Sequence, residues 1–553
     1  MFPRLPAFLA LALLLTGCAS PPSQPVTVNL ALINDFHGYL EPNPALFDVG
    51  RRGQPMGGIA NVGGLIDHLR QADPQTLVIG SGDLIGASPA VSALWADEPT
   101  LQAMNLLGLQ LSAVGNHELD SGKAELLRLV HGGCESSRPA KACQFEPHWQ
   151  GTRFPYLAAN LLDSRTGKPL FPAYRILEAH GQKIAFVGAV LKALDQVVTS
   201  KGLAGLQVTD EADSINALIP ELRAQGVDAI VAVIHQGGTS QEPGSDCHDL
   251  QGPIVEVVKR LDPAVDLVAS AHSHKAYTCH VGRIPVLQGG SYGQLVSHVS
   301  LQIDPRQRRV TAIQMENLPV IPGHYPPDSQ LAAWVARVAA RSKTVLERPV
   351  ARLGVSRLAP RYDAAGESAL GDLIADAQLA AVREQGAQIA LMNSGGIRNE
   401  LALAPGQSRL TYAQLASCQP FANTLTLVDL TGAQLRELLE QQWSRDPDAR
   451  PLQVSAGFTY VWDGRRPVGQ RVVPGSIRLN GKALAEDQYY RVVANNFLAD
   501  GGDGAALLRD GSNRLETAIT DLEALERYLV RQERLGKPAG QAEPAGRIRR
   551  QDG

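Results

Sequence analysis

Short apolar runs, each followed by small or polar residues, divide the first part of the chain from about Val26 to Leu318. Runs of this length fit strands that are buried on both faces of a sheet, and helical patterns alternate with them. This alternation predicts an α/β region whose sheets are covered by flanking helices. The five runs that matter most span residues 28–34, 76–82, 111–115, 229–234 and 265–271.

A proline-rich connector at residues 318–327 separates this block from a second one. Asp328 can cap a helix that runs to about Leu346, and helical segments and short strands then alternate. The tail after Gly536 is expected to be poorly ordered. We therefore predict a first domain at 26–320, a linker with a hinge helix at 321–349 and a second domain at 350–549.

The 553 residues suffice for two or more domains, because a typical domain takes roughly 100–200 residues. Apolar residues make up 44% of the chain, which indicates a globular protein. The net charge is −4 and no long basic run occurs, so the chain lacks the electrostatic footprint of a protein that binds nucleic-acid polymers.

The first residues have the pattern of an export signal. Arg4 precedes an apolar run, Leu5 to Leu15, that is too short to span a bilayer. The string Leu-Thr-Gly-Cys18 then resembles a bacterial lipobox, which predicts a signal peptide at 1–18 and lipidation of Cys18. The alternative is an ordinary signal peptide with a chance cysteine. No later stretch resembles a membrane span, so we expect an exported lipoprotein of the periplasm or outer membrane, held there only by its lipid.

Five further cysteines agree with export to an oxidising compartment. Four cysteines can pair in three ways, and the sequence alone does not choose among them. Short spacing favours Cys134–Cys143, while Cys247 and Cys279 flank one candidate catalytic segment, which a disulfide between them would staple. Cys418 is then left as a free buried thiol.

Each of the five apolar runs ends in side chains that can bind metals. Because the carboxyl ends of parallel strands share one edge of a sheet, these side chains can converge on one site. Imidazole suits zinc and other first-row metals, and carboxylate suits manganese and harder ions. Two such metals about 3.5–4 Å apart polarise a phosphoryl group and hold a hydroxide for in-line attack. The residues at the strand ends are Asp35, His37, Asp83, Asn116, His117, His235, His272 and His274.

The order of these residues resembles the calcineurin-like metallophosphoesterases. The strings Asn34-Asp-Phe-His-Gly, Gly115-Asn-His-Glu-Leu-Asp and Ala271-His-Ser-His-Lys-Ala-Tyr resemble the 5′-nucleotidase branch, and the resemblance covers nearly the whole mature chain. It implies a two-domain α/β fold, with a four-layer N-terminal domain of buried sheets and flanking helices and a mixed α/β C-terminal domain that binds substrate. It also implies two divalent ions (Zn, Mn or Co), one held by Asp35, His37, Asp83 and His274 and the other by Asp83, Asn116, His235 and His272.

The resemblance further assigns His117 and Asp120 to a catalytic dyad. A carboxylate orients an imidazole and raises its basicity, so a protonated His117 would stabilise charge on the phosphoryl group and the leaving oxygen. The alternative for Asp120 is a helix N-cap ahead of Gly122.

Motifs in the second block supply the predicted substrate contacts. A Gly-rich turn after the strand that ends at Met392 leads to an arginine, a combination that suits an anion. In the family, two phenylalanines sandwich the base and an aspartate contacts the ribose; alternatively, each phenylalanine is a core residue. The implied substrate-binding residues are Asn393, Arg398, Phe421, Asn423, Phe497 and Asp503.

Together these features predict an exported, metal-dependent hydrolase of nucleotide substrates that releases nucleoside and phosphate. One departure from the family pattern is that Ala369 and Asp372 stand where a further phosphate-binding arginine is usual. A 2′,3′-cyclic-nucleotide phosphodiesterase or a UDP-sugar diphosphatase on the same scaffold is therefore the alternative. The alternative of another class is a nucleotide-binding lipoprotein without turnover; loss of a metal ligand would favour it, and every ligand is present.

Overall fold

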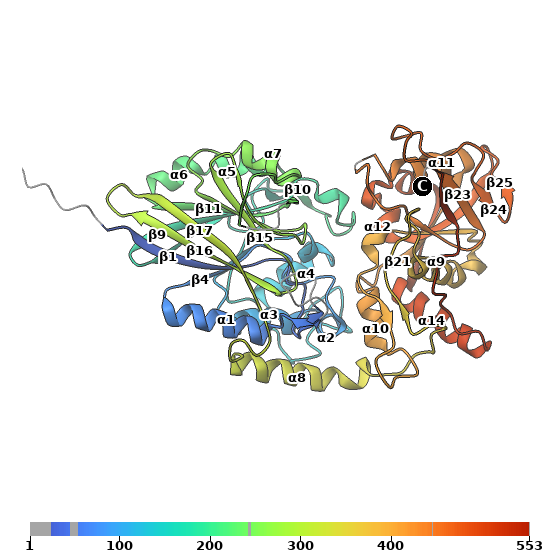
Figure 1. Cartoon of the computed structure of the whole chain (residues 1–553), viewed down its shortest axis with the longest axis horizontal. Helices are drawn as coiled ribbons and strands as arrows, with labels where there is room; N and C mark the ends of the chain where they lie inside the picture. Colours follow the sequence, from blue (N-terminus) through green and yellow to red (C-terminus); the bar gives the residue numbers. More distant parts are fainter. Residues whose placement is uncertain (1–23, 45–53, 242–244, 445, 552–553) are drawn as a thin grey trace, which may run out of the picture.

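The computed structural model describes residues 24–44, 54–241, 245–444 and 446–551, so the predicted signal peptide and Cys18 lie outside the described residues. The chain forms an N-terminal part and a C-terminal part that lie side by side, on the left and right of Figure 1. The two-domain α/β fold expected from the sequence is confirmed.

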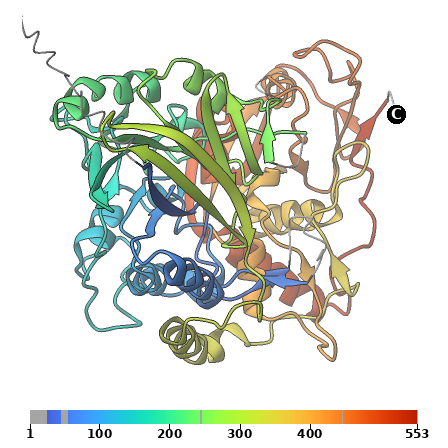
Figure 2. The ribbon, with the colours of Figure 1, turned by 60° about the vertical axis from the view of Figure 1, so that its left-hand side comes forward.

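Two large sheets form most of the N-terminal part, and their central strands run parallel. In the view of Figure 2, the long β16–β17 hairpin crosses the face of this part. The first sheet has the order β17 (Arg309–Pro319), β16 (Leu295–Asp304), β1 (Val26–Ile33), β4 (Leu77–Gly80), β5 (Leu111–Ala113), β6 (Tyr156–Leu157). The second has the order β12 (Ser245–Cys247), β14 (Ala276–Val281), β15 (Ile284–Gly289), β13 (Leu267–Ser270), β11 (Ala229–His235), β9 (Gln182–Val190), β8 (Tyr174–Ala179).

Apolar side chains from both sheets meet in a shared core, which includes Leu30, Ile79 and Val231. Every residue of β11 is buried, as expected for a strand covered on both faces. Helices cover the outer face of each sheet, so the N-terminal part has four layers, as predicted. These helices are α1 (Ile59–Ala72), α3 (Glu98–Leu107) and α4 (Lys123–His131) on the first sheet, and α5 (Glu211–Asn216), α6 (Ile219–Ala224) and α7 (Pro253–Lys259) on the second.

The C-terminal part is built on a mixed five-stranded sheet with helices α9 (Ala369–Ala381) and α14 (Asp521–Arg534) packed against it. Its order is β22 (Gln453–Val454), β19 (Ile389–Met392), β26 (Tyr489–Asn495), β21 (Thr424–Thr431), β27 (Ser512–Thr520). A smaller sheet has the order β25 (Lys482–Ala483), β24 (Arg478–Leu479), β23 (Phe458–Trp462), β28 (Ile548–Arg550).

The expectation of a poorly ordered tail after Gly536 is wrong. Strand β28 pairs in parallel with β23, and the guanidinium of Arg547 donates to both carboxylate oxygens of Asp376 at 2.8 Å. The buried carboxylate of Glu367 accepts from the backbone N–H groups of Arg547 and Ile548. Ion pairs and strand pairing therefore order a segment whose composition alone suggested disorder.

Helix α8 (Ser329–Leu346) connects the two parts along the lower edge of Figure 1. Its N-cap is Asp328, as predicted, whose carboxylate accepts from the backbone N–H of Leu331 at 2.8 Å. It packs against α1, α2 (Ala90–Ala93) and α3 of the N-terminal part and against α10 (Tyr412–Cys418) of the C-terminal part. The indole of Trp334 also donates to the carbonyl of Pro99 at 2.9 Å. The linker helix is thus fastened chiefly to the N-terminal part.

The structure contains both expected disulfides, Cys134–Cys143 and Cys247–Cys279, and Cys418 is free and buried. The second bridge joins β12 to β14 at the edge of the second sheet. Among the residues that the structure describes, no helix has the length and apolar character needed to cross a membrane.

Candidate metal centre and substrate site

The predicted metal ligands lie at or just after the carboxyl ends of β1, β4, β5, β11 and β13. Many of them have an unusual backbone, because φ is positive at Asp35 (47°), His37 (48°), Asp83 (50°), His272 (71°) and His274 (55°). A left-handed conformation is uncommon for residues other than glycine, and such strain gathers at functional sites where the surrounding fold enforces it. Here the strained turns after β1, β4 and β13 bring their side chains to the same place as the ligands at the ends of β5 and β11.

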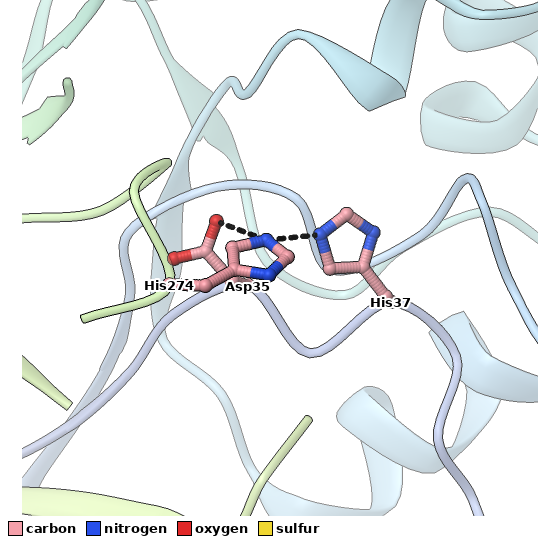
Figure 3. Close-up of side chains that lie close together, drawn as sticks. All are labelled: Asp35, His37 and His274. Atoms are coloured by element: carbon pink, nitrogen blue, oxygen red, sulfur yellow. Dashed lines mark hydrogen bonds and ion pairs between the residues drawn. The ribbon is translucent and has the colours of Figure 1, made fainter. Parts of the chain in front are cut away.

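One cluster contains Asp35, His37 and His274 (Figure 3). The Nε2 atoms of His37 and His274 are 3.1 Å apart, and Nε2 of His274 is 3.5 Å from Oδ1 of Asp35. Nδ1 of His37 donates to the carbonyl of Gly86 at 2.8 Å, which leaves a lone pair on its Nε2. A lone pair that faces another ring nitrogen and a nearby carboxylate fits a cation between them.

The second cluster contains Asp83, His235, His272 and Asn116. Nδ1 of His235 donates to the carbonyl of Ser81 at 2.8 Å, so Nε2 is the atom that would bind a metal ion after losing its proton. That Nε2 faces two acceptors at 3.1 Å, Oδ1 of Asn116 and Oδ2 of Asp83, and Nδ1 of His272 is 2.9 Å from the same asparagine oxygen. Ring nitrogens and side-chain oxygens that face one another at these distances fit a cation bound between them.

Asp83 lies between the two clusters. Its Oδ2 is 3.1 Å from Nε2 of His235 and 3.6 Å from Nε2 of His37, and its Oδ1 accepts from the backbone N–H of His117 at 2.9 Å. A carboxylate in this position can contribute to both metal sites.

Burial and neighbouring charges shift the pKa values of the clustered side chains. Burial lowers the pKa of His37 and of His272 to about 3, so both rings are neutral and able to bind metal. Burial acts to lower the pKa of His235 as well, but the charge of Asp83 outweighs it and raises that pKa to about 9. Burial raises the pKa of Asp35 to about 7, with the charge of Asp83 adding to it. Divalent ions bound at the site would displace the protons held by His235 and Asp35.

Two residues orient the ligands, and the sequence analysis gave them no role. The buried carboxylate of Glu118 accepts from three backbone N–H groups, those of Asp83 (2.9 Å), Leu84 (2.8 Å) and Gly115 (2.7 Å). It thereby fastens the loop that carries Asp83 to the loop that carries the asparagine ligand. Asn34 donates to Oδ2 of Asp35 at 2.7 Å and to the carbonyl of Gly290. Both residues belong to the quoted motifs, but their partners Gly290, Asp83 and Leu84 are distant in sequence.

The two residues of the predicted dyad, His117 and Asp120, are in contact. Nδ1 of His117 is 2.9 Å from Oδ2 of Asp120. Burial acts to lower the pKa of His117, but the charges of Asp120 and Asp83 outweigh it, so the pKa is raised above its usual value. The alternative role of Asp120 as a helix cap is not borne out, because α4 begins after Gly122 without a side-chain cap.

A cavity of about 350 Å³ opens beside the dyad and is lined by both parts of the chain. All six predicted substrate residues line it; both phenylalanines are partly buried, and Phe497 also packs against the core of the C-terminal part. The ring of Phe421 stacks on the ring of His117 (5.6 Å between centroids, 22°), and the guanidinium of Arg398 lies 5.8 Å from the same phenylalanine ring. Asn393 donates to Oδ2 of Asp503 at 2.7 Å. The predicted phosphate and ribose contacts therefore face one space.

The sequence analysis missed one wall of this cavity. Val197, Val198 and Thr199 line it from the loop that follows β9. A short helical turn in that loop, Leu194–Gln196, contacts the turn Gly502–Gly504 of the C-terminal part. No strand end or glycine-rich motif marks these residues, so the sequence carried no signal for them.

Ala369 and Asp372, the two candidate places for the further arginine, do not line the cavity, and Asp372 has other partners. Its Oδ2 accepts from the backbone N–H of Ala545, and its Oδ1 is 3.6 Å from Nε of Arg547. Burial raises the pKa of Asp372 to about 7. This side chain serves the packing of the C-terminal tail.

Comparisons with known proteins match both parts. The profile of the calcineurin-like phosphoesterases matches residues 28–276, and that of the 5′-nucleotidase C-terminal domain matches residues 341–510. The chain belongs to the 5′-nucleotidase family of metallophosphoesterases. Members of this family are phosphoric ester hydrolases, and the paired clusters at the strand ends fit that chemistry.

Individual relatives extend over nearly the whole chain. Cell wall protein Lmo0130 of Listeria monocytogenes is 30% identical over 546 residues, which cover 93% of this chain and 68% of that protein. Endonuclease YhcR of Bacillus subtilis is 30% identical over 92% of this chain, but the match spans only 40% of that protein's length. The crystal structure of a 5′-nucleotidase precursor from Thermus thermophilus is 26% identical with a TM-score of 0.76, covering 96% of this chain and 100% of that one.

Proposed function

We propose that this protein hydrolyses phosphate esters of nucleotides to nucleoside and phosphate, using two divalent metal ions. The observation that carries the proposal is the pair of ligand clusters that share Asp83 and open onto a cavity lined by Phe421, Phe497 and Arg398. Zinc, manganese and cobalt suit this mixture of imidazole, carboxylate and amide ligands.

Seven side chains would hold the ions. When bound, two such ions polarise the phosphoryl group and supply a nucleophile derived from water. The chain's own contribution is to fix the ligands through the backbone bonds to His37 and His235 and through Glu118. The proposed metal ligands are Asp35, His37, Asp83 and His274 for one ion, and Asp83, Asn116, His235 and His272 for the other.

His117 and Asp120 act on the reacting group. The hydrogen bond to Asp120 and the raised pKa of His117 favour an imidazolium, which stabilises negative charge on the phosphoryl and leaving oxygens. On the substrate side, Arg398 binds phosphate, Asp503 binds the ribose and Phe421 and Phe497 pack on the base. Asn393 and Asn423 complete the polar contacts. Base stacking of this kind contributes about 1–3 kcal/mol and tolerates any base.

We also propose that the chain divides into domains at 26–320 and 350–549, joined by a linker at 321–349 that contains the hinge.

We further propose that the protein is exported as a lipoprotein and is lipidated at Cys18. The lipobox-like string supports export, and one relative is named a cell wall protein. Mass spectrometry of the mature protein tests the anchor, since an unmodified N-terminus upstream of Cys18 would contradict it.

A 2′,3′-cyclic-nucleotide phosphodiesterase or UDP-sugar diphosphatase is the second candidate. What favours it is that Ala369 and Asp372 stand at the candidate places of the family's further arginine, and that Asp372 contacts the C-terminal tail. Hydrolysis of a panel of AMP, ATP, UDP-glucose and 2′,3′-cyclic AMP by purified, metal-loaded protein separates the candidates. The proposed function expects AMP to have the highest kcat/KM, and preference for UDP-glucose or the cyclic nucleotide would replace it with the second candidate.

A further inference from the structure

Tyr292 has a strained backbone at the edge of the metal centre. It follows β15, its φ is 61°, and its backbone N–H donates to the carbonyl of Asp35 at 2.8 Å. A left-handed conformation at a bulky residue other than glycine costs roughly 1–3 kcal/mol and persists only where the surrounding structure enforces it. The fold therefore tolerates strain in order to place this side chain.

The ring of Tyr292 packs against two proposed metal ligands. Its centroid lies 5.8 Å from that of His37 and 5.3 Å from that of His274, both in edge-on geometry. On its other side it stacks on Tyr39, with 4.1 Å between centroids and 23° between planes. The ring is thus held between the imidazoles of one metal cluster and a second tyrosine, so its hydroxyl has little freedom.

The hydroxyl of Tyr292 faces the C-terminal part. Nη2 of Arg398 donates to it at 3.5 Å, and the hydroxyl of Tyr39 interacts with both Tyr292 and Asn399. Arg398 and Asn399 follow the Gly-rich turn after β19, so these contacts join the metal-carrying part to the arginine proposed to bind phosphate. Arg398 and His274 line the same cavity.

We propose that Tyr292 is a positioning residue that holds the guanidinium of Arg398 over the metal centre. This inference rests on the proposed function, because the contact affects hydrolysis only if Arg398 binds the phosphoryl group of the substrate. Without the hydroxyl, the guanidinium has more rotamers available and must be ordered by the substrate itself, which weakens binding. A tyrosine that merely fills space beside the histidines would need only its ring.

Tyr292→Phe is the discriminating variant, because it keeps the ring, the stacking on Tyr39 and the backbone turn. Removal of a hydrogen bond to a charged group at this long distance is expected to lower kcat/KM by about tenfold, mainly through KM. Because Arg398 would contact the phosphoryl group common to all substrates, AMP and p-nitrophenyl phosphate should be affected equally. Metal content should stay at the wild-type value, and Tyr489→Phe, at an exposed tyrosine, should behave as wild type.

A double-mutant cycle with Arg398→Ala provides the readout that a structural role would not change. If Tyr292 acts through Arg398, adding Tyr292→Phe to Arg398→Ala lowers kcat/KM by no more than about twofold. Independent, multiplicative effects of the two substitutions, or Tyr292→Phe kinetics equal to wild type, would overturn the inference. These results differ from a failure of the proposed function, in which the wild-type protein itself does not hydrolyse AMP.

Discussion

Substitution of Glu118 by glutamine tests how the fold fixes the loops that carry the metal ligands Asp83 and Asn116. The carboxylate accepts from three backbone N–H groups, two through Oε2 (Asp83 and Gly115) and one through Oε1 (Leu84). A glutamine has one acceptor oxygen, so its NH₂ group must face at least one of these donors in either orientation. The variant therefore loses at least one hydrogen bond to a charged group and leaves a buried N–H without an acceptor.

The loss can be sized from these bonds. One hydrogen bond to a charged group contributes about 1.5–3 kcal/mol, and an unsatisfied buried N–H costs a further ~1–3 kcal/mol, so about 2.5–6 kcal/mol of unfolding free energy is at risk. Because the affected loops carry Asp83 and Asn116, part of this loss should appear in metal binding. Residues that orient metal ligands typically account for 10–100-fold in affinity or activity.

The assay is a chelator-competition titration of metal-stripped protein with Mn²⁺ at pH 8, together with thermal unfolding. Burial and the charge of Asp83 raise the pKa of Glu118 to about 7, so its carboxylate is ionised at this pH. Glu367→Gln is the matched control, because this buried carboxylate also accepts from two backbone N–H groups but lies outside the cavity. Both variants should lose stability, and only Glu118→Gln should lose metal affinity; wild-type metal affinity in Glu118→Gln would refute the reasoning.

Three further predictions concern catalysis, binding and stability. His117→Asn should lower kcat by 10²–10⁴-fold while the metal content stays intact, and loss of metal by elemental analysis would identify His117 as a ligand instead. Phe497→Ala should raise KM for AMP with little change in kcat and leave p-nitrophenyl phosphate hydrolysis near wild type; equal damage to both substrates would assign the ring to packing. Burial raises the pKa of Asp521 to about 7, above the roughly 3.9 of an unfolded aspartate, so the folded state retains a proton and the unfolding free energy should fall as the pH rises from about 4 to 7. In chemical denaturation, Asp521→Asn should make the unfolding free energy depend less steeply on pH. An unchanged slope between pH 4 and 7 would contradict this role of Asp521.

The sequence was most informative where chemistry follows a buried strand. The ends of five apolar runs predicted that aspartate, asparagine and histidine side chains converge, because the carboxyl ends of parallel strands share an edge. In the structure the five strands belong to two sheets, with β1, β4 and β5 in the first and β11 and β13 in the second, and the ligands at their carboxyl ends still meet. The structure places Asp35, His37 and His274 together in one cluster and Asp83, His235 and His272 in another. Only the positive φ values of these turns, which hold the ligands close, had no counterpart in the sequence pattern.

Other features depend on contacts that periodicity does not encode. Glu118 acts on backbone N–H groups of a loop more than thirty residues away, a link that no local pattern reveals. Val198 reaches the cavity from an irregular loop, and its apolar character alone suggested ordinary packing. The C-terminal tail was expected to be poorly ordered, but the ion pair of Arg547 and the strand β28 bind it to the rest of the C-terminal part.

The most direct test of the central claim is phosphate release from AMP by metal-stripped protein as Mn²⁺ is added back in known equivalents. The account predicts no hydrolysis in the stripped protein and a rate that reaches its plateau at two ions per chain. Asp83→Ala should stay inactive throughout, because this carboxylate lies between both clusters. Full activity without metal, or no hydrolysis of AMP with two ions bound, would contradict the account.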